Sequence, residues 1–170
     1  MDNLPIIALV LALAFALYWI AFRLPARGAA QPIEVFIAAS PAAIWPRLQP
    51  SGWNGLFYDR RFNDVTLADA DERVWTYEEV SAGGRAAYRL TQPVYERDRR
   101  LINVVTGVNG VDIAPDRQFG IVYDLHPADG GTRLRITLET REISAGARYS
   151  AFRTQESFAR ALQGEFQSRS

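Results

Sequence analysis

The first feature of the hydrophobic pattern is an uninterrupted apolar run at the N-terminus. From Leu4 to Phe22 the chain carries no charged residue. As a helix this run would span roughly 28 Å, close to the thickness of the hydrocarbon layer of a bilayer. Its apolar residues surround the helix instead of forming one stripe, which argues against a core helix. The pattern therefore predicts a transmembrane anchor over residues 1–24.

The residues that flank this run favour a retained anchor and predict its orientation. The first three residues include no lysine or arginine, which a secretory signal peptide normally carries there. Small residues after the run leave cleavage open as an alternative. Aromatic residues Tyr18 and Trp19 lie near its end, and Arg23 and Arg27 follow, so the positive-inside rule predicts a cytoplasmic domain. We expect a single-pass protein of a bacterial inner membrane that contacts the bilayer through residues 4–22.

Beyond a linker at residues 25–31, the pattern predicts a strand followed by a helix. Alternating apolar residues indicate a strand over residues 32–39. Ser40 is a favourable N-cap and Pro41 suits the first helical position, so a helix begins here. Pro46 removes a backbone hydrogen bond, which predicts a short or kinked helix. A second brief helix or turn is expected over residues 51–59.

The remainder of the chain predicts a sheet followed by one long helix. Six strands are expected at residues 63–69, 73–80, 85–92, 99–108, 118–127 and 131–143. No helical pattern interrupts them, which is typical of an antiparallel meander. Residues 147–168 have apolar positions at helical spacing. Burying both the sheet face and the helix stripe requires the sheet to curve around the helix, so we expect one domain over residues 32–170.

This order of elements resembles a known superfamily. The stretches "IEVFIAASPAAIWPRL" and "FGIVYDLHPADGGTRLRITLETR" are similar to the helix-grip superfamily, often called SRPBCC, which includes START lipid-binding domains, birch-pollen-allergen-like proteins and bacterial polyketide cyclase/dehydrase-like proteins. The resemblance implies an α+β helix-grip fold, in which a curved antiparallel seven-stranded sheet wraps around a long C-terminal helix. Here a single transmembrane helix is expected to precede it. The resemblance also implies an apolar cavity between sheet and helix.

Composition narrows the chemistry that this domain can perform. The chain has 19 basic and 19 acidic residues and no net charge, so no broad field favours nucleic acid. All the basic residues are arginine, and there is no cysteine. Schiff-base catalysis, thiol nucleophiles and cysteine-ligated metals are therefore excluded. We expect no cofactor, no metal and no nucleic-acid partner, and the sequence leaves open whether the chain has a protein partner.

Candidate proton-transfer groups are few. His126 is the single histidine of the chain. It alternates with the apolar, inward-facing residues of its strand, so it is expected to face solvent. By the same alternation, at most one of Glu78 and Glu79 faces the cavity, and a solvated position is favoured for both. No catalytic residue is predicted.

The candidate ligand cavity is built mainly from aromatic residues. We expect Trp53, Phe57 and Tyr58 at its mouth, with residues 107–118 either as a lid or as a passive loop. Tyr88, Asn103, Tyr123 and Thr140 are polar residues on inner faces, where they need a hydrogen-bond partner or a ligand. The complete candidate set is Trp53, Phe57, Tyr58, Trp75, Tyr88, Asn103, Tyr123 and Phe158. Core packing is the favoured interpretation for Phe158 and an equal alternative for Trp53, Phe57 and Tyr58.

Taken together, the sequence predicts a membrane-anchored, non-enzymatic domain that binds a small hydrophobic ligand of the lipid, quinone or isoprenoid class. A polyketide cyclase or dehydratase-like enzyme is one alternative. A partner-binding module of a membrane assembly is another.

Overall fold

A computed structural model describes residues 4–23, 31–140 and 145–168 of the chain. The elements are α1 (Leu4–Arg23), β1 (Ile33–Ile37), α2 (Pro41–Leu48), the 3-10 helix η1 (Pro50–Gly52), β2 (Arg60–Asp69), β3 (Val74–Ser81), β4 (Gly84–Glu96), β5 (Arg100–Val108), β6 (Val111–Asp112), the 3-10 helix η2 (Pro115–Arg117), β7 (Phe119–Ala128), β8 (Gly131–Thr140) and α3 (Ala145–Gln167). Most of the predicted linker, residues 25–31, lies outside the described residues.

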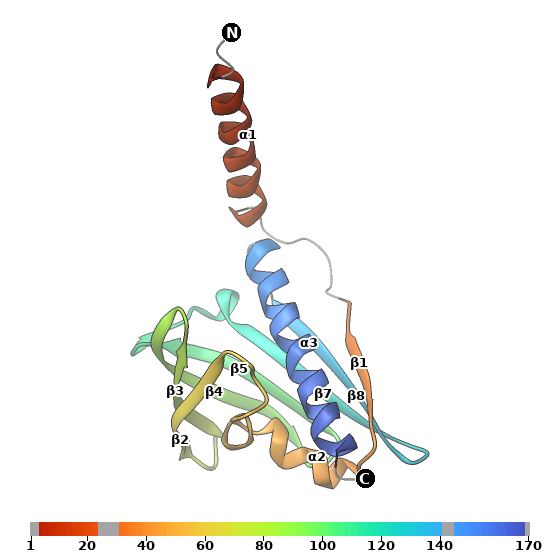
Figure 1. Ribbon diagram of the computed structural model, residues 1–170. Helices are drawn as coiled ribbons and strands as arrows, with labels where there is room; N and C mark the ends of the chain where they lie inside the picture. The colour runs from red at the N-terminus through yellow and green to blue at the C-terminus, as the bar shows by residue number, and fades with distance from the viewer. Residues whose placement is uncertain (1–3, 24–30, 141–144, 169–170) are drawn as a thin grey trace.

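The start of α2 follows the local sequence closely. Ser40 is the N-cap, and its Oγ accepts a hydrogen bond from the Ala43 amide at 3.4 Å. Pro41 occupies the first helical position, and the helix, which contains Pro46, ends after eight residues. The buried face of α2 is formed by Ile44, Trp45 and Leu48. The predicted short helix is confirmed, and it closes one end of the sheet (Figure 1).

The strands form one antiparallel sheet in the order β1-β8-β7-β5-β4-β3-β2, and β6 pairs with β5 beside this path. The six predicted strands after α2 are confirmed, the last of them over residues 131–140, since its predicted end at 141–143 lies outside the described residues, and β6 is an addition that the sequence pattern missed. The sheet curves around α3, which runs along its concave face (Figure 1). This arrangement is the helix-grip fold predicted from the sequence.

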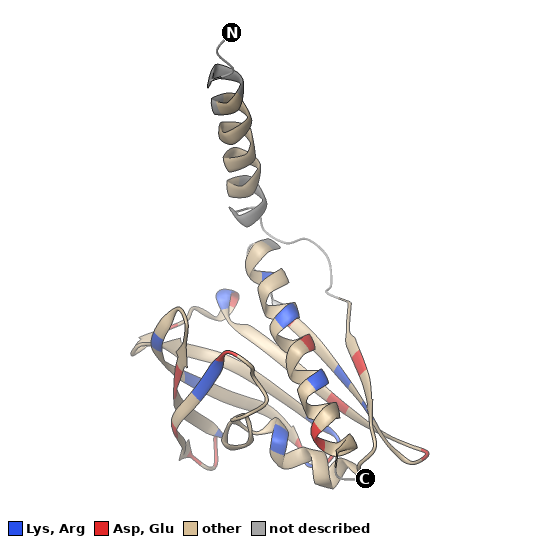
Figure 2. Cartoon of the chain, in the orientation of Figure 1, with Lys and Arg blue, Asp and Glu red and all other residues tan. Residues whose placement is uncertain are grey.

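The core lies between the concave face of the sheet and α3. Alternate residues of the strands point inward, as in β7, where Ile121, Tyr123 and Leu125 are all buried. On α3, Phe158, Ala159 and Leu162 are fully buried. Charged residues of both signs are spread over the domain without a large region of one sign, as the balanced composition predicts (Figure 2).

The structure corrects the prediction of a membrane anchor. Helix α1 projects from the domain beyond the N-terminal end of α3 (Figure 1). Crossing a bilayer takes about 20 consecutive apolar residues, and no helix within the described part of the chain combines the necessary length and apolarity. The predicted single-pass, inner-membrane location is therefore wrong.

Candidate functional site

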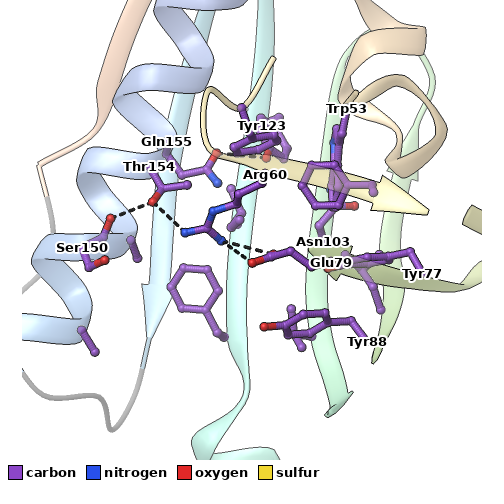
Figure 3. Close-up of a pocket in the computed structure, with 18 residues that line it drawn as sticks. Trp53, Arg60, Tyr77, Glu79, Tyr88, Asn103, Tyr123, Ser150, Thr154 and Gln155 are labelled. Atoms are coloured by element: carbon purple, nitrogen blue, oxygen red, sulfur yellow. Dashed lines mark hydrogen bonds and ion pairs between the residues drawn. The ribbon is translucent and has the colours of Figure 1, made fainter. Parts of the chain in front are cut away.

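A cavity of about 330 Å³ lies between the concave face of the sheet and α3. Strands β2, β3, β4, β5 and β7 form one wall, and α3 supplies Ala151, Thr154 and Gln155 to the other (Figure 3). Aromatic and aliphatic side chains make up most of the surface, together with a few polar groups. This combination is typical of a site for a small organic molecule.

One end of the cavity is walled by an aromatic cluster. Trp53 packs edge-to-face against Phe57, Phe62 and Tyr77, with ring centroids 5.2 to 6.1 Å apart. The indole N–H of Trp53 donates to the Leu48 carbonyl at 3.2 Å, which anchors the cluster to α2. Such ring pairs contribute beyond the area that they bury, so this wall is firmly held.

An ion pair joins both walls of the cavity. Nη1 of Arg60 on β2 donates to both carboxylate oxygens of Glu79 on β3, at 3.1 and 3.2 Å. Its Nη2 donates to Thr154 Oγ1 on α3 at 3.3 Å. The side chains of Arg60 and Glu79 are 28% and 15% exposed. Arg60 therefore links the β2–β3 edge of the sheet to the helix across the cavity (Figure 3).

A buried amide network lies behind the β4–β5 wall. Pro93 has no N–H, and the β4–β5 register shifts between Thr91 and Val94, so Gln92 lies within an irregular part of the ladder. Its Oε1 accepts from Trp75 Nε1 at 3.1 Å and from Arg73 Nη2 at 2.8 Å. Its Nε2 donates to Asn103 Oδ1 at 2.9 Å and to Gln49 Oε1 at 3.1 Å. Every hydrogen-bonding atom of the Gln92 side chain is thus engaged.

The three phenols at the cavity stay protonated at neutral pH. Burial, followed by the charge of Glu79, raises the pKa of Tyr77 and of Tyr88 above the usual value. Burial alone raises the pKa of Tyr123, whose hydroxyl donates to Gln155 Oε1 at 3.2 Å. Tyr77 and Tyr88 stack with their ring centroids 5.4 Å apart. These phenols are hydrogen-bond donors and not bases under physiological conditions.

The residues predicted for the cavity occupy three kinds of position. Trp53, Phe57, Tyr88, Asn103 and Tyr123 line the cavity. Phe158 is in the core, where it stacks on Phe57, and Trp75 is buried against Gln92. Tyr58 is fully exposed and lies outside the cavity.

The predicted mouth and lid differ from the structure. Trp53 and Phe57 are only 5% and 8% exposed, so they form an inner wall. In the segment 107–118, β6 pairs with β5 and Gln118 Nε2 donates to the Ile113 carbonyl, so this segment is an ordered hairpin. None of its residues lines the cavity. His126 is exposed, as predicted, whereas the side chain of Thr140 lies outside the described set.

Sequence reasoning missed several polar residues of the site. Arg60 precedes the buried Phe62 by two residues, so strand alternation alone places it on the inner face. Glu79 follows Tyr77 by the same spacing and lines the cavity, while Glu78 lies on the other face. The alternation rule is confirmed for this pair, but the favoured solvated position is wrong for Glu79.

Comparison with known proteins gives the fold and no closer relationship. No family model and no curated protein matches the chain. Among solved structures, protein NE0264 from Nitrosomonas europaea is 14% identical, with a TM-score of 0.67 over 82% of this chain and 95% of that one. Ara h 8.0201 is 12% identical, with a TM-score of 0.62 over 83% and 99%. An AHSA1-like protein from Aeromonas hydrophila is 14% identical, with a TM-score of 0.56 over 79% and 94%. The chain therefore shares the helix-grip fold of these structures.

Proposed function

We propose that residues 32–170 form a binding domain for a small hydrophobic molecule, held in the cavity between the sheet and α3. The observation that carries this proposal is the cavity itself, with about 330 Å³ of space inside an otherwise packed core. Well-packed interiors contain few voids larger than a water molecule. A space of this size, lined largely by aromatic and aliphatic groups, fits one compact ligand of the lipid, quinone or isoprenoid class.

The chemistry of the lining supports binding without catalysis. Glu79 is the one carboxylate among the described lining residues, and Arg60 neutralises it. The phenols have raised pKa values and do not act as bases at neutral pH. A general base must be free to take a proton from the substrate, whereas the Glu79 carboxylate is held by two hydrogen bonds from Arg60 Nη1.

The test compares two tryptophan substitutions on α3 of the full chain. Ala151 lines the cavity, whereas Ser157 is exposed on the same helix. Ala151→Trp should fill the cavity, because an indole ring occupies much of the available space. Ser157→Trp adds the same ring outside it and serves as the matched control.

Small molecules extracted from each purified protein would be identified by mass spectrometry, and binding of hexylbenzene would be measured by calorimetry. The wild type and Ser157→Trp should carry and bind an apolar molecule, and Ala151→Trp should not. Equal binding by all three proteins, or binding by none, would contradict the proposal.

A further inference from the structure

Asn103 presents a hydrogen-bond donor that no group in the described part of the chain satisfies. The residue lines the cavity and is 1% exposed. Its Nδ2 has no hydrogen-bond partner among the described residues. A buried amide donor without a partner is costly, so most such groups in native proteins are bonded to protein, water or a ligand.

The neighbouring network fixes which way the Asn103 amide points. The indole N–H of Trp75 and the guanidinium of Arg73 are donors only, so the atom of Gln92 that faces them is its oxygen. Nε2 of Gln92 therefore faces Asn103, and the atom of Asn103 that meets it is the acceptor Oδ1, at 2.9 Å. An exchange of O and N in either amide would set donor against donor. Nδ2 is consequently the atom of this cavity-lining amide that is left without a partner among the described residues.

The charges around the cavity favour a neutral acceptor over a carboxylate. The positive charge of Arg60 is already bound to Glu79. At both Tyr77 and Tyr88 the influence of Glu79 on the pKa exceeds the opposite influence of Arg60. A ligand anion placed beside these phenols would meet the same negative potential.

On the basis of the proposed function, we infer that the cavity selects an apolar ligand with a neutral carbonyl oxygen, which accepts a hydrogen bond from Asn103 Nδ2. The apolar body lies against the aromatic wall, and the carbonyl group lies on the β4–β5 wall. The donor is held in place through Gln92 before any ligand arrives, so little ordering is required on binding.

Three probes with one carbon skeleton test this inference on the full chain: hexanophenone, hexylbenzene and 6-phenylhexanoate. Hexanophenone should bind about tenfold more tightly than either of the others, the difference expected for one satisfied buried donor. Asn103→Leu keeps the number and branching of the side-chain heavy atoms and removes the donor, and Gln92 Nε2 keeps Gln49 Oε1 as a partner. In this variant the preference for hexanophenone over hexylbenzene should disappear. Asn63→Leu, at an exposed position outside the cavity, should leave it unchanged.

Infrared spectroscopy of bound hexanophenone supplies a second measurement that does not depend on affinity. The carbonyl stretch should lie at lower frequency than in hexane, and the shift should be absent in Asn103→Leu. The inference is wrong if hexylbenzene binds as tightly as hexanophenone or if 6-phenylhexanoate binds most tightly. It is also wrong if the carbonyl stretch is unshifted, because Nδ2 would then donate to water instead of to the ligand. Failure of all three probes to bind would instead contradict the proposed function.

Discussion

Gln92 is the centre of the buried network, and its substitution by leucine gives a sharp test of the energetics. Gln92→Leu keeps most of the volume and removes both the acceptor and the donor of the amide. Trp75 Nε1 then loses its hydrogen-bond partner, and so does Asn103 Oδ1. Arg73 retains Gln49 Oε1 at 3.2 Å and its position over the Tyr95 ring, 3.7 Å from the centroid.

The expected loss of stability follows from the two groups left without partners. Each buried polar group that loses its partner costs about 1–3 kcal/mol. Two such groups together would destabilise the fold by several kcal/mol. Rotation of the Asn103 amide toward another partner and burial of the apolar leucine offset part of this cost, so we expect a total loss of about 3 kcal/mol. For a chain of this length that corresponds to a fall of roughly 6–12 °C in Tm.

Urea unfolding followed by circular dichroism measures this change. Gln163→Leu is the matched control, because Gln163 Nε2 donates to the Phe36 carbonyl at 2.7 Å in an exposed place, where water replaces the bond. Its cost should stay below about 1 kcal/mol. The double variant Gln92→Leu with Trp75→Phe removes both partners, so its cost should be less than the sum of the single costs by at least about 1 kcal/mol. Equal costs at Gln92 and Gln163, or simple additivity in the double variant, would refute the reasoning.

Two further predictions concern the tyrosines and the aromatic wall. Because burial raises the pKa of Tyr123, the unfolded chain releases its phenol proton first as pH rises through 10, and wild-type stability falls there. Tyr123→Phe lacks this loss, so the stability deficit of the variant should shrink by about 0.8 kcal/mol between pH 8 and pH 10.5 in urea unfolding; a constant deficit would contradict the burial. Phe57→Ala should cost about 3–5 kcal/mol because Phe57 is 8% exposed, whereas Tyr58→Ala at a fully exposed position should stay within about 0.5 kcal/mol in thermal unfolding; similar costs would return Phe57 to the rim.

The fold was accessible from the sequence because its signals are local. The Ser40 cap with Pro41 starts α2, and period-two alternation on β7 identifies its buried face. Strand β6 was missed because its two residues, both exposed, are too few to produce an alternating pattern.

The polar part of the site depends on contacts between distant residues, which one sequence does not reveal. Gln92 bonds to Asn103 across 11 positions and to Gln49 across 43 positions of the chain. Arg60 reaches Thr154, 94 positions away. Alternation predicted that Asn103 points inward, but only the three-dimensional arrangement shows that its oxygen is occupied and its nitrogen is not. Strand alternation therefore predicts which residues face the cavity. Which of their donors and acceptors remain without a hydrogen-bond partner depends on the contacts in the folded structure.

The last prediction concerns the charge balance at the cavity. Glu79→Gln keeps the shape of the side chain and removes the nearer of the two carboxylates that pair with Arg60, so that Asp59, 3.7 Å from Arg60 Nε, is the one that remains among the described residues. One unit charge removed about 8 Å from a bound carboxylate, at an effective dielectric constant of about 20, changes the interaction by about 2 kcal/mol.

Partial exposure of Arg60, at 28%, reduces this to about 1 kcal/mol, or roughly fivefold in affinity. Binding of 6-phenylhexanoate should therefore become roughly fivefold tighter in Glu79→Gln, and added salt should weaken the gain. Glu78→Gln changes the same net charge on the opposite face of β3 and should have little effect. An equal gain in both variants would attribute the effect to overall charge, and no gain in either would show that Arg60 does not face the ligand. A gain confined to Glu79→Gln would mean that this one carboxylate makes the cavity selective for neutral molecules.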